Sequence, residues 1–319
     1  MPNLFEGPEK KLEVILHRGD PAIRQNRRGR WDRVVAASRA QILSRVASEG
    51  IDAYLLSESS LFVWDDRVLM ITCGQTTLIE ALPEIVAVVG RDNVAMVFYE
   101  RKNLMFPDRQ PDVADFEVEA ARIDRVFPGK SYRLGPANHD HVHVFFSSHA
   151  RLRPEKDLTL QVLMSDLAPE LRAVFDARRV PDAASSTRTA GLDRLLPPMR
   201  TDAYLFQPYG YSLNGVRRAE YYTLHVTPQP ESSYASFETN MLAADYPRLV
   251  GDLLAVFRPG RFSLVLTSSM DRRCLPAHGS VCGPFDGYQV TEKSLYEFDC
   301  GYALTFLNLV RAGTAGEKR

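Results

Sequence analysis

The sequence has few cysteines, almost no net charge and no long apolar run. Its four cysteines, Cys73, Cys274, Cys282 and Cys300, form no CxxC pair and no zinc-site spacing. The N-terminus is charged and carries no secretory signal, so we expect free thiols in a reducing cytoplasm. The formal net charge of −1 gives no general attraction to nucleic acid or anionic membranes. The sequence has no run of 18 apolar residues, which argues against a transmembrane helix.

The composition is that of an ordinary globular protein. Of the 319 residues, 45% are hydrophobic and 25% are charged, which is enough apolar material for a sizeable core. A chain of this length forms one large domain or two.

Short apolar or alternating runs predict most of the secondary structure. Strands are predicted at 12–16, 51–57, 61–64, 67–72, 94–99, 158–164, 203–207, 221–227, 233–238, 262–267 and 302–309. Helices are predicted at 31–49, 76–89 (bent or broken around Pro83), within 111–125, near 169–176 and at 245–257. Residues 181–201, rich in Ser, Thr, Ala and Pro, are interpreted as a connecting region.

This pattern of many short strands with a few helices between them indicates an α+β protein with antiparallel sheets. Both halves of the chain run through strands and then a long helix. An internal duplication is therefore open, although no residue-level repeat is visible.

Two polar patterns have an ordinary explanation beside a functional one. Arg24, Arg27, Arg28 and Arg30 form either a phosphate-binding arm or a solvated basic loop, and we favour the loop. The alternating histidines at 139, 141 and 143 would share one face of a strand. No further ligand pattern accompanies them, so we expect no metal there.

The stretch Leu-Ser-Glu-Ser-Ser-Leu-Phe-Val at 56–63 is the central feature of the sequence. Taken alone, Glu58-Ser59-Ser60 is a polar turn between two strands. Its context is more specific, because Thr72-Cys73-Gly74 follows the next predicted strand. Other short motifs follow in order, namely FEGPEK (5–10), YERKNLMFP (99–107), GYSLNG (210–215), HVTPQPE (225–231), YASFETN (234–240) and VFRPGRF (256–262).

Together, these motifs resemble the eukaryotic-type S-adenosylmethionine decarboxylases from Phe5 to about residue 309. The resemblance implies a four-layer αββα sandwich of two antiparallel sheets with outer helices. It also implies one domain over 1–311, followed by a disordered tail at 312–319. The family acts in polyamine synthesis on a small-molecule substrate, and the resemblance leaves a homodimer open.

Self-cleavage between Glu58 and Ser59 is the main chemical implication of the resemblance. It would give chains 1–58 and 59–319 and convert Ser59 into a covalent pyruvoyl group. A serine hydroxyl needs geometry and oxyanion support to attack an amide. By position, Ser212 supports the cyclic intermediate and His225 removes the Cα proton of residue 59.

Decarboxylation then needs an electron sink, which the pyruvoyl ketone supplies by condensing with the substrate amine. Cys73 matches the family's proton donor, and a thiol is largely protonated near neutral pH. The further matches are Phe5 and Phe206 for adenine stacking, Glu6 and Glu9 as active-site acids, and Glu58 and Gln229 among the substrate-binding positions.

The sequence departs from the family pattern at several of these positions. Gln229 stands where the family has the acid that binds the ribose hydroxyls, and Tyr209 replaces a cysteine. The residues matching the diamine-activation site are Glu13, Asp157, Thr159 and Glu238, but Ile71 replaces a basic residue and Gln161 an acid. These changes argue against activation by putrescine.

Two alternatives remain at this stage. The same pyruvoyl chemistry could act on arginine, ornithine or another amino acid. A non-catalytic regulatory paralogue is the second alternative, and the joint presence of Ser59, Cys73, Ser212 and His225 argues against it.

Overall fold

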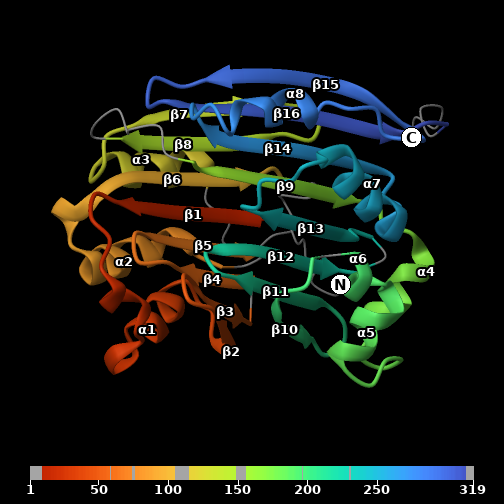
Figure 1. Cartoon of the computed structure of the whole chain (residues 1–319), viewed down its shortest axis with the longest axis horizontal. Helices are drawn as coiled ribbons and strands as arrows, with labels where there is room; N and C mark the ends of the chain where they lie inside the picture. Colours follow the sequence, from red (N-terminus) through yellow and green to blue (C-terminus); the bar gives the residue numbers. More distant parts are fainter. Residues whose placement is uncertain are drawn as a thin grey trace.

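The computed structural model describes residues 9–57, 59–73, 76–104, 115–148, 156–195, 197–229 and 231–313. Within these ranges the chain forms two eight-stranded sheets, and every pairing between their strands is antiparallel (Figure 1). No helix in the described part of the chain is long and apolar enough to cross a membrane.

The two sheets have the same strand order. The first contains, from edge to edge, β2 (Ile42–Ala47), β3 (Asp52–Leu56), β4 (Ser59–Val63), β5 (Arg67–Cys73), β1 (Glu9–Leu16), β6 (Val94–Lys102), β8 (Val142–Ser148) and β7 (Lys130–Leu134). The second contains β10 (Arg200–Leu205), β11 (Tyr211–Arg217), β12 (Glu220–Thr227), β13 (Tyr234–Thr239), β9 (Leu158–Ser165), β14 (Arg261–Ser269), β16 (Tyr302–Arg311) and β15 (Tyr288–Glu297). Each strand of the second sheet takes the place of the strand eight numbers earlier, so the fold repeats in topology where the sequence shows no repeat.

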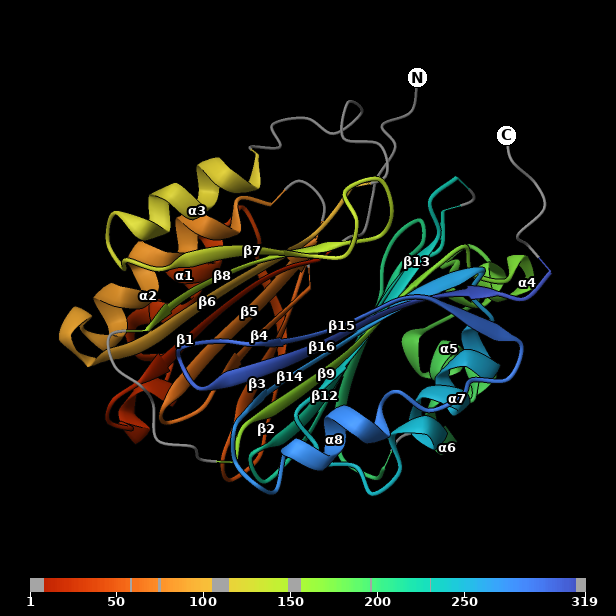
Figure 2. The same ribbon diagram turned by 90° about the horizontal axis from the view of Figure 1, so that it is seen from above.

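Helices cover the outer face of each sheet, and the two sheets pack face to face (Figure 2). On the first sheet these are α1 (Arg30–Ala37), α2 (Ala81–Val89) and α3 (Phe116–Asp124). On the second they are α4 (Pro169–Arg172), α5 (Ala183–Ala190), α6 (Leu192–Leu195), α7 (Tyr246–Phe257) and α8 (Leu275–Ser280). The predicted four-layer αββα sandwich is confirmed.

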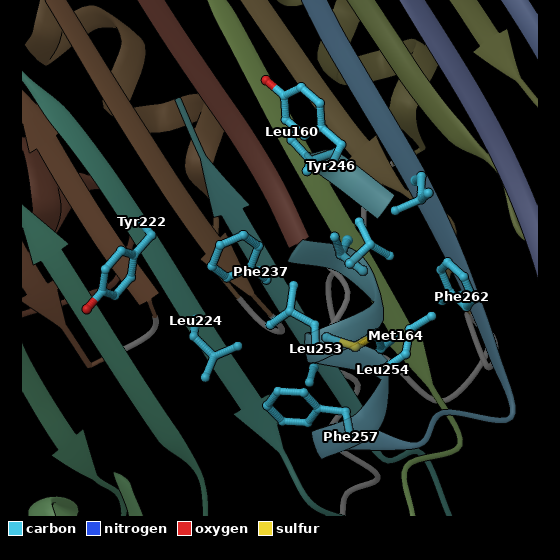
Figure 3. Packing of buried hydrophobic residues seen from close by; sticks show 14 of the residues in the cluster. Leu160, Met164, Tyr222, Leu224, Phe237, Tyr246, Leu253, Leu254, Phe257 and Phe262 are labelled. Atoms are coloured by element: carbon cyan, nitrogen blue, oxygen red, sulfur yellow. The ribbon is translucent and has the colours of Figure 1, made fainter. Parts of the chain in front are cut away.

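The apolar core lies mainly between each sheet and its helices. On the second sheet, α7 packs Leu253 and Phe257 against the outer face, near Leu224 and Phe237 (Figure 3). Central strands such as β4 and β13 have every residue buried, because both of their faces are covered. Their inward residues therefore meet the other sheet, and many of them are polar.

Two sequence-based predictions were wrong. The helix predicted at 31–49 ends at Ala37, and β2 then pairs with β3 at the edge of the sheet. Arg39 adopts a positive φ of 64°, which cannot continue a helix. The connecting region at 181–201 contains α5 and α6. Asp182 caps α5 by accepting from the Ser185 amide, and Gly191 ends it with a left-handed φ of 75°.

The remaining predictions mostly hold. The break expected near Pro83 occurs just before it, since a 3₁₀ turn (Leu78–Glu80) precedes α2 and Pro83 lies in the first turn of that helix. Strands β7, β8, β11 and β15 were not among the predicted strands. Strand β15 is a half-exposed edge strand with a polar sequence, and β11 contains Asn214 and Gly215, which are uncommon in strands.

Candidate active site

Ser59 begins β4, and it pairs with Leu56 of β3. Its φ is 125°, a region that residues with a Cβ rarely adopt. The side chain is buried, and Oγ has no hydrogen-bond partner among the described residues. The serine is therefore held in a strained backbone with an uncommitted hydroxyl. Glu58 lies outside the described residues.

A cavity of about 320 Å³ opens beside Ser59. Its walls come from β4, β5, β11, β12 and the loops that follow β10 and β12. Six residues predicted from the sequence line it, namely Ser59, Cys73, Phe206, Ser212, His225 and Gln229. Residues far apart in the chain are thus brought to one place, because the two sheets face each other here.

His225 on β12 lies opposite Ser212 on β11 in the strand register. The Ser212 Oγ is 2.8 Å from the His225 Nδ1. On the other side of the ring, Nε2 lies 2.8 Å from the Thr223 Oγ1 and 3.4 Å from the Ser60 Oγ. Burial lowers the pKa of His225 to about 3. The imidazole is therefore neutral near pH 7 and has a lone pair with which to accept a proton.

Cys73 ends β5 and is partly exposed to the cavity. Its neighbour Thr72 pairs with Ser59, and Cys73 itself pairs with Glu9 of β1. Glu9 accepts a hydrogen bond from the Ser236 hydroxyl, and burial raises the pKa of this carboxyl to about 8. Near neutral pH Glu9 is mostly protonated, so it places a neutral acid beside the thiol.

Phe206 lies in the loop after β10, in ring contact with Tyr204 at 4.8 Å between ring centres. The Phe206 amide donates to the carbonyl of Gly210 at 2.8 Å, which closes the loop. Gly210 has φ 125°, and a Cβ there would lie 3.4 Å from the Cβ of Phe206, so glycine suits this position. The other predicted aromatic, Phe5, and the predicted acid Glu6 lie outside the described residues.

The residues predicted for a diamine site, Glu13, Asp157, Thr159 and Glu238, meet between the two sheets. The Nη1 of Arg67 lies 2.9 Å from the Glu13 Oε1 and 2.7 Å from the Asp157 Oδ1. Lys11 extends its ammonium to Glu238. The cavity left at this place measures only about 10 Å³. The positively charged side chains of Lys11 and Arg67 thus fill the space around these carboxylates.

Sequence reasoning missed Lys11 and Arg67, although one signal was visible. Leu12, Val14 and Leu16 point towards the helices, so Lys11 and Glu13 on the alternate face of β1 must point towards the other sheet. The departures from the family pattern also find partners. Gln161 donates to the Glu238 Oε2 at 2.7 Å, and Ile71 joins an apolar cluster with Phe62 and Tyr221. Tyr209 lines the cavity beside Ser59.

Members of the two polar patterns seen in the sequence, the arginines at 24–30 and the alternating histidines at 139–143, contact other side chains. The Arg24 Nε lies 3.0 Å from the Asp52 Oδ2. His143 packs its ring on Phe116 at 4.8 Å, and burial lowers its pKa to about 4. Among the described residues, no three His, Cys, Asp or Glu side chains are grouped as a metal site requires.

Comparisons with known proteins point to one family. The family model for adenosylmethionine decarboxylase matches residues 2–310. The S-adenosylmethionine decarboxylase proenzyme of Drosophila melanogaster is 36% identical, covering 83% of this chain and 82% of that protein. The proenzyme of Leishmania donovani is 35% identical, covering 98% and 87%. A crystal structure of the Trypanosoma brucei AdoMetDC-delta26 monomer has a TM-score of 0.65 and 26% identity, covering 79% of this chain and 99% of that one.

Proposed function

The chain belongs to the adenosylmethionine decarboxylase family, and we propose that it cuts itself between Glu58 and Ser59 to form the pyruvoyl group with which it works. It is an S-adenosylmethionine decarboxylase of polyamine synthesis. The observation that carries the self-cleavage is Ser59 itself, strained and uncommitted in the same cavity as Cys73, Ser212 and His225. We place the protein in the cytoplasm as one domain over residues 1–311.

The first step exchanges an amide for an ester. Ser59 Oγ attacks the carbonyl carbon of residue 58, the C–N bond breaks, and the hydroxyl proton passes to the released amine. The positive φ supports this step, because relief of backbone strain favours breaking the peptide bond at Ser59. Ser212 lines the same cavity, and its hydroxyl can turn from His225 Nδ1 to donate to the oxygen of the cyclic intermediate.

The second step eliminates the ester. His225 Nδ1, which lies beside Ser212 in the cavity that Ser59 also lines, takes the Cα proton of residue 59. The electrons form a Cα–Cβ double bond, and the Cβ–O bond breaks. The carboxylate of Glu58 leaves as the new end of chain 1–58. Water then replaces the nitrogen on residue 59 and releases ammonia, which leaves the pyruvoyl group at the start of chain 59–319. The neutral, buried imidazole suits this role because it holds no proton at the accepting atom.

The residues around Ser59 fit a pyruvoyl group, which supplies an electron sink for the departing carboxylate of the substrate. Phe206 offers a flat apolar face to adenine, and Gln229 lies in the same cavity to bind the ribose. Cys73 gives its proton to the substrate carbon that loses carbon dioxide. Neutral Glu9 beside Cys73 adds no negative charge that would repel a carboxylate.

Gln229 is the position that distinguishes this chain within the family. Because a neutral amide replaces the family's ribose-binding acid, arginine and ornithine are the comparison substrates for the test.

Intact mass and carbon dioxide release test the proposal. The purified protein should consist of chains 1–58 and 59–319, and it should release labelled carbon dioxide from S-adenosylmethionine rather than from arginine or ornithine. Ser59→Ala should remain one chain and release none. A wild-type protein that stays uncut, with an unmodified serine, would overturn the proposal.

A further inference from the structure

Asn214 lies behind the His225 ring in a buried network that joins the two sheets. It sits on β11, opposite Thr223 of β12 in the register, and its side chain is fully buried. Its Oδ1 accepts hydrogen bonds from the Thr223 hydroxyl at 2.8 Å and from the Ser60 hydroxyl at 2.8 Å. Ser60 belongs to β4 of the other sheet and directly follows Ser59.

Counting the protons of this network fixes the state of the His225 ring. A hydroxyl has one proton, and those of Thr223 and Ser60 are both given to Asn214. The Thr223 oxygen can therefore only accept from His225 Nε2, which lies 2.8 Å away. Nε2 then carries the ring proton, and Nδ1 is left with its lone pair. The Ser212 hydroxyl, 2.8 Å from Nδ1, donates to that lone pair in the uncut chain and leaves it free when it turns to the intermediate.

We propose that Asn214 is a positioning residue that holds His225 in the tautomer needed to take the Cα proton of residue 59. The role rests on the proposed self-cleavage. A turned amide would present Nδ2 to the two hydroxyls and free their protons to donate to Nε2. The ring proton would then sit on Nδ1, which could no longer act as the base.

One orphan group accompanies this arrangement. Asn214 Nδ2 is buried and has no hydrogen-bond partner among the described residues. An unpaired buried donor lowers the stability of the fold. Asn214 therefore leaves its Nδ2 unsatisfied while its Oδ1 accepts from two hydroxyls. Such a cost is common at functional sites.

The Ser60 bond gives Asn214 a second effect on the same reaction. Once the bond before Ser59 is cut, residue 59 becomes a chain end. Its place beside His225 then depends on the pairing of β4 with β5 and on the hydrogen bond from Ser60 to Asn214. The same amide thus orients the base and holds the strand that carries the reacting residue.

The tautomer can be read directly by ¹⁵N NMR of labelled histidine in the uncut Ser59→Ala protein. The His225 resonances should show a protonated Nε2 and a bare Nδ1. Asn214→Asp, whose oxygens can only accept from the hydroxyls, should keep this pattern. Asn214→Leu should lose it. Asn308→Leu serves as a matched control, because it removes another buried amide that accepts from a serine, Ser263, away from His225. A protonated Nδ1 in the Ser59→Ala protein overturns the proposal.

Processing provides a second readout in chains that retain Ser59. Asn214→Leu should slow elimination roughly 10²-fold or more, within the range for a positioned base. It should therefore accumulate the ester, which hydroxylamine cuts into two chains. Asn214→Asp should process within about tenfold of wild type, with its pH profile moved upwards because the added charge makes His225 more basic. Asn308→Leu should process normally.

Three outcomes would overturn the role of Asn214. These are wild-type processing by a folded Asn214→Leu, an uncut Asn214→Leu without hydroxylamine-sensitive ester, and failure of Asn214→Asp to process any better than Asn214→Leu. Failure of the self-cleavage itself is distinguishable, because the wild type would then stay uncut while the NMR pattern remained as described.

Discussion

The ammonium of Lys11 lies 3.0 Å from the carboxylate of Glu238, between the two sheets of the sandwich. Both side chains are almost completely buried, with 4% and 1% of their surface exposed. Lys11 also lies 5.6 Å from the centre of the Phe98 ring. The same carboxylate accepts hydrogen bonds from Gln161 and Tyr221. Glu238 is thus fully engaged by the protein itself, and a diamine would have to displace Lys11 to reach it.

Putrescine should therefore have little effect on the wild-type enzyme. Activity is expected to change by less than about twofold across millimolar putrescine, or roughly 0.4 kcal/mol. Lys11→Met removes the charge at similar volume and leaves Glu238 buried without its ion-pair partner. This change should lower the free energy of unfolding by about 3–5 kcal/mol. This variant should be less active, and putrescine should stimulate it in a saturable manner. Carbon dioxide release at increasing diamine concentration measures both effects.

Lys130→Met is the matched control for this change. Lys130 pairs with Asp299 on the surface, where 64% of its side chain is exposed. A surface pair contributes little, so this variant should match the wild type with and without putrescine. Order-of-magnitude activation of the wild type would show that a diamine does enter between the sheets.

How far the sequence predicted this site depended on the kind of signal. The family motifs predicted a site at Ser59, Cys73, Ser212 and His225, and the structure gathers these residues around one cavity. Lys11 was missed because an ion pair between sheets depends on which strands face each other. One strand cannot show that on its own.

The same limit applies to the fold. The apolar residues of β2 also fit a helical period, so only its pairing with β3 decides the structure at 42–47. By contrast, the cap at Asp182 was a local signal that could have predicted α5.

Stability should fall as the pH rises above 6.5. Burial raises the pKa of Glu9 to about 8 and that of Glu100 to about 7, while both titrate near 4.5 when unfolded. The folded protein therefore holds more protons than the unfolded chain. The contribution of these two carboxyls to stability is complete below pH 4.5 and is lost as the pH rises through 7–8. His225, with its pKa lowered to about 3, acts oppositely, but only below pH 6.5.

Glu9→Gln tests this dependence because glutamine imitates the protonated acid. The unfolding temperature of Ser59→Ala should fall between pH 6.5 and 8.5, with Glu9 accounting for about 2 kcal/mol. Adding Glu9→Gln should flatten the fall. Glu117→Gln, at an exposed position on α3, should leave it unchanged. Equal slopes with and without Glu9→Gln would mean that Glu9 is ionised in the fold.

Cys73→Ala should separate processing from turnover. Thr72, next to Cys73, pairs with Ser59, but the thiol takes no part in the proposed cleavage. The variant should still form two chains on a gel and lose decarboxylation by roughly 10²–10⁴-fold, as expected for a positioned acid. Cys300→Ala, which changes another partly exposed thiol, should keep both activities. Unchanged turnover in Cys73→Ala would assign the proton to another group.

Gln229→Glu should improve the binding of S-adenosylmethionine. A carboxylate accepts from both ribose hydroxyls at once, and such charge-assisted bonds are the stronger kind. Glutamine has one acceptor oxygen and an NH₂ donor, so one hydroxyl must turn to accept. The difference is on the order of 1–2 kcal/mol. KM should therefore fall roughly five- to thirtyfold, with kcat nearly unchanged.

Gln207→Glu provides the control for charge alone, because Gln207 lines the same cavity but does not match the ribose-binding position. Adding a carboxylate there should not lower KM in the same way, even though it also attracts the positively charged sulfonium of the substrate. A gain at both positions would mean that net charge, not the diol, limits binding. If the wild type instead releases carbon dioxide only from arginine or ornithine and Gln229→Glu restores nothing, the substrate assignment fails while self-cleavage at Ser59 stands, because the two depend on different residues of the cavity.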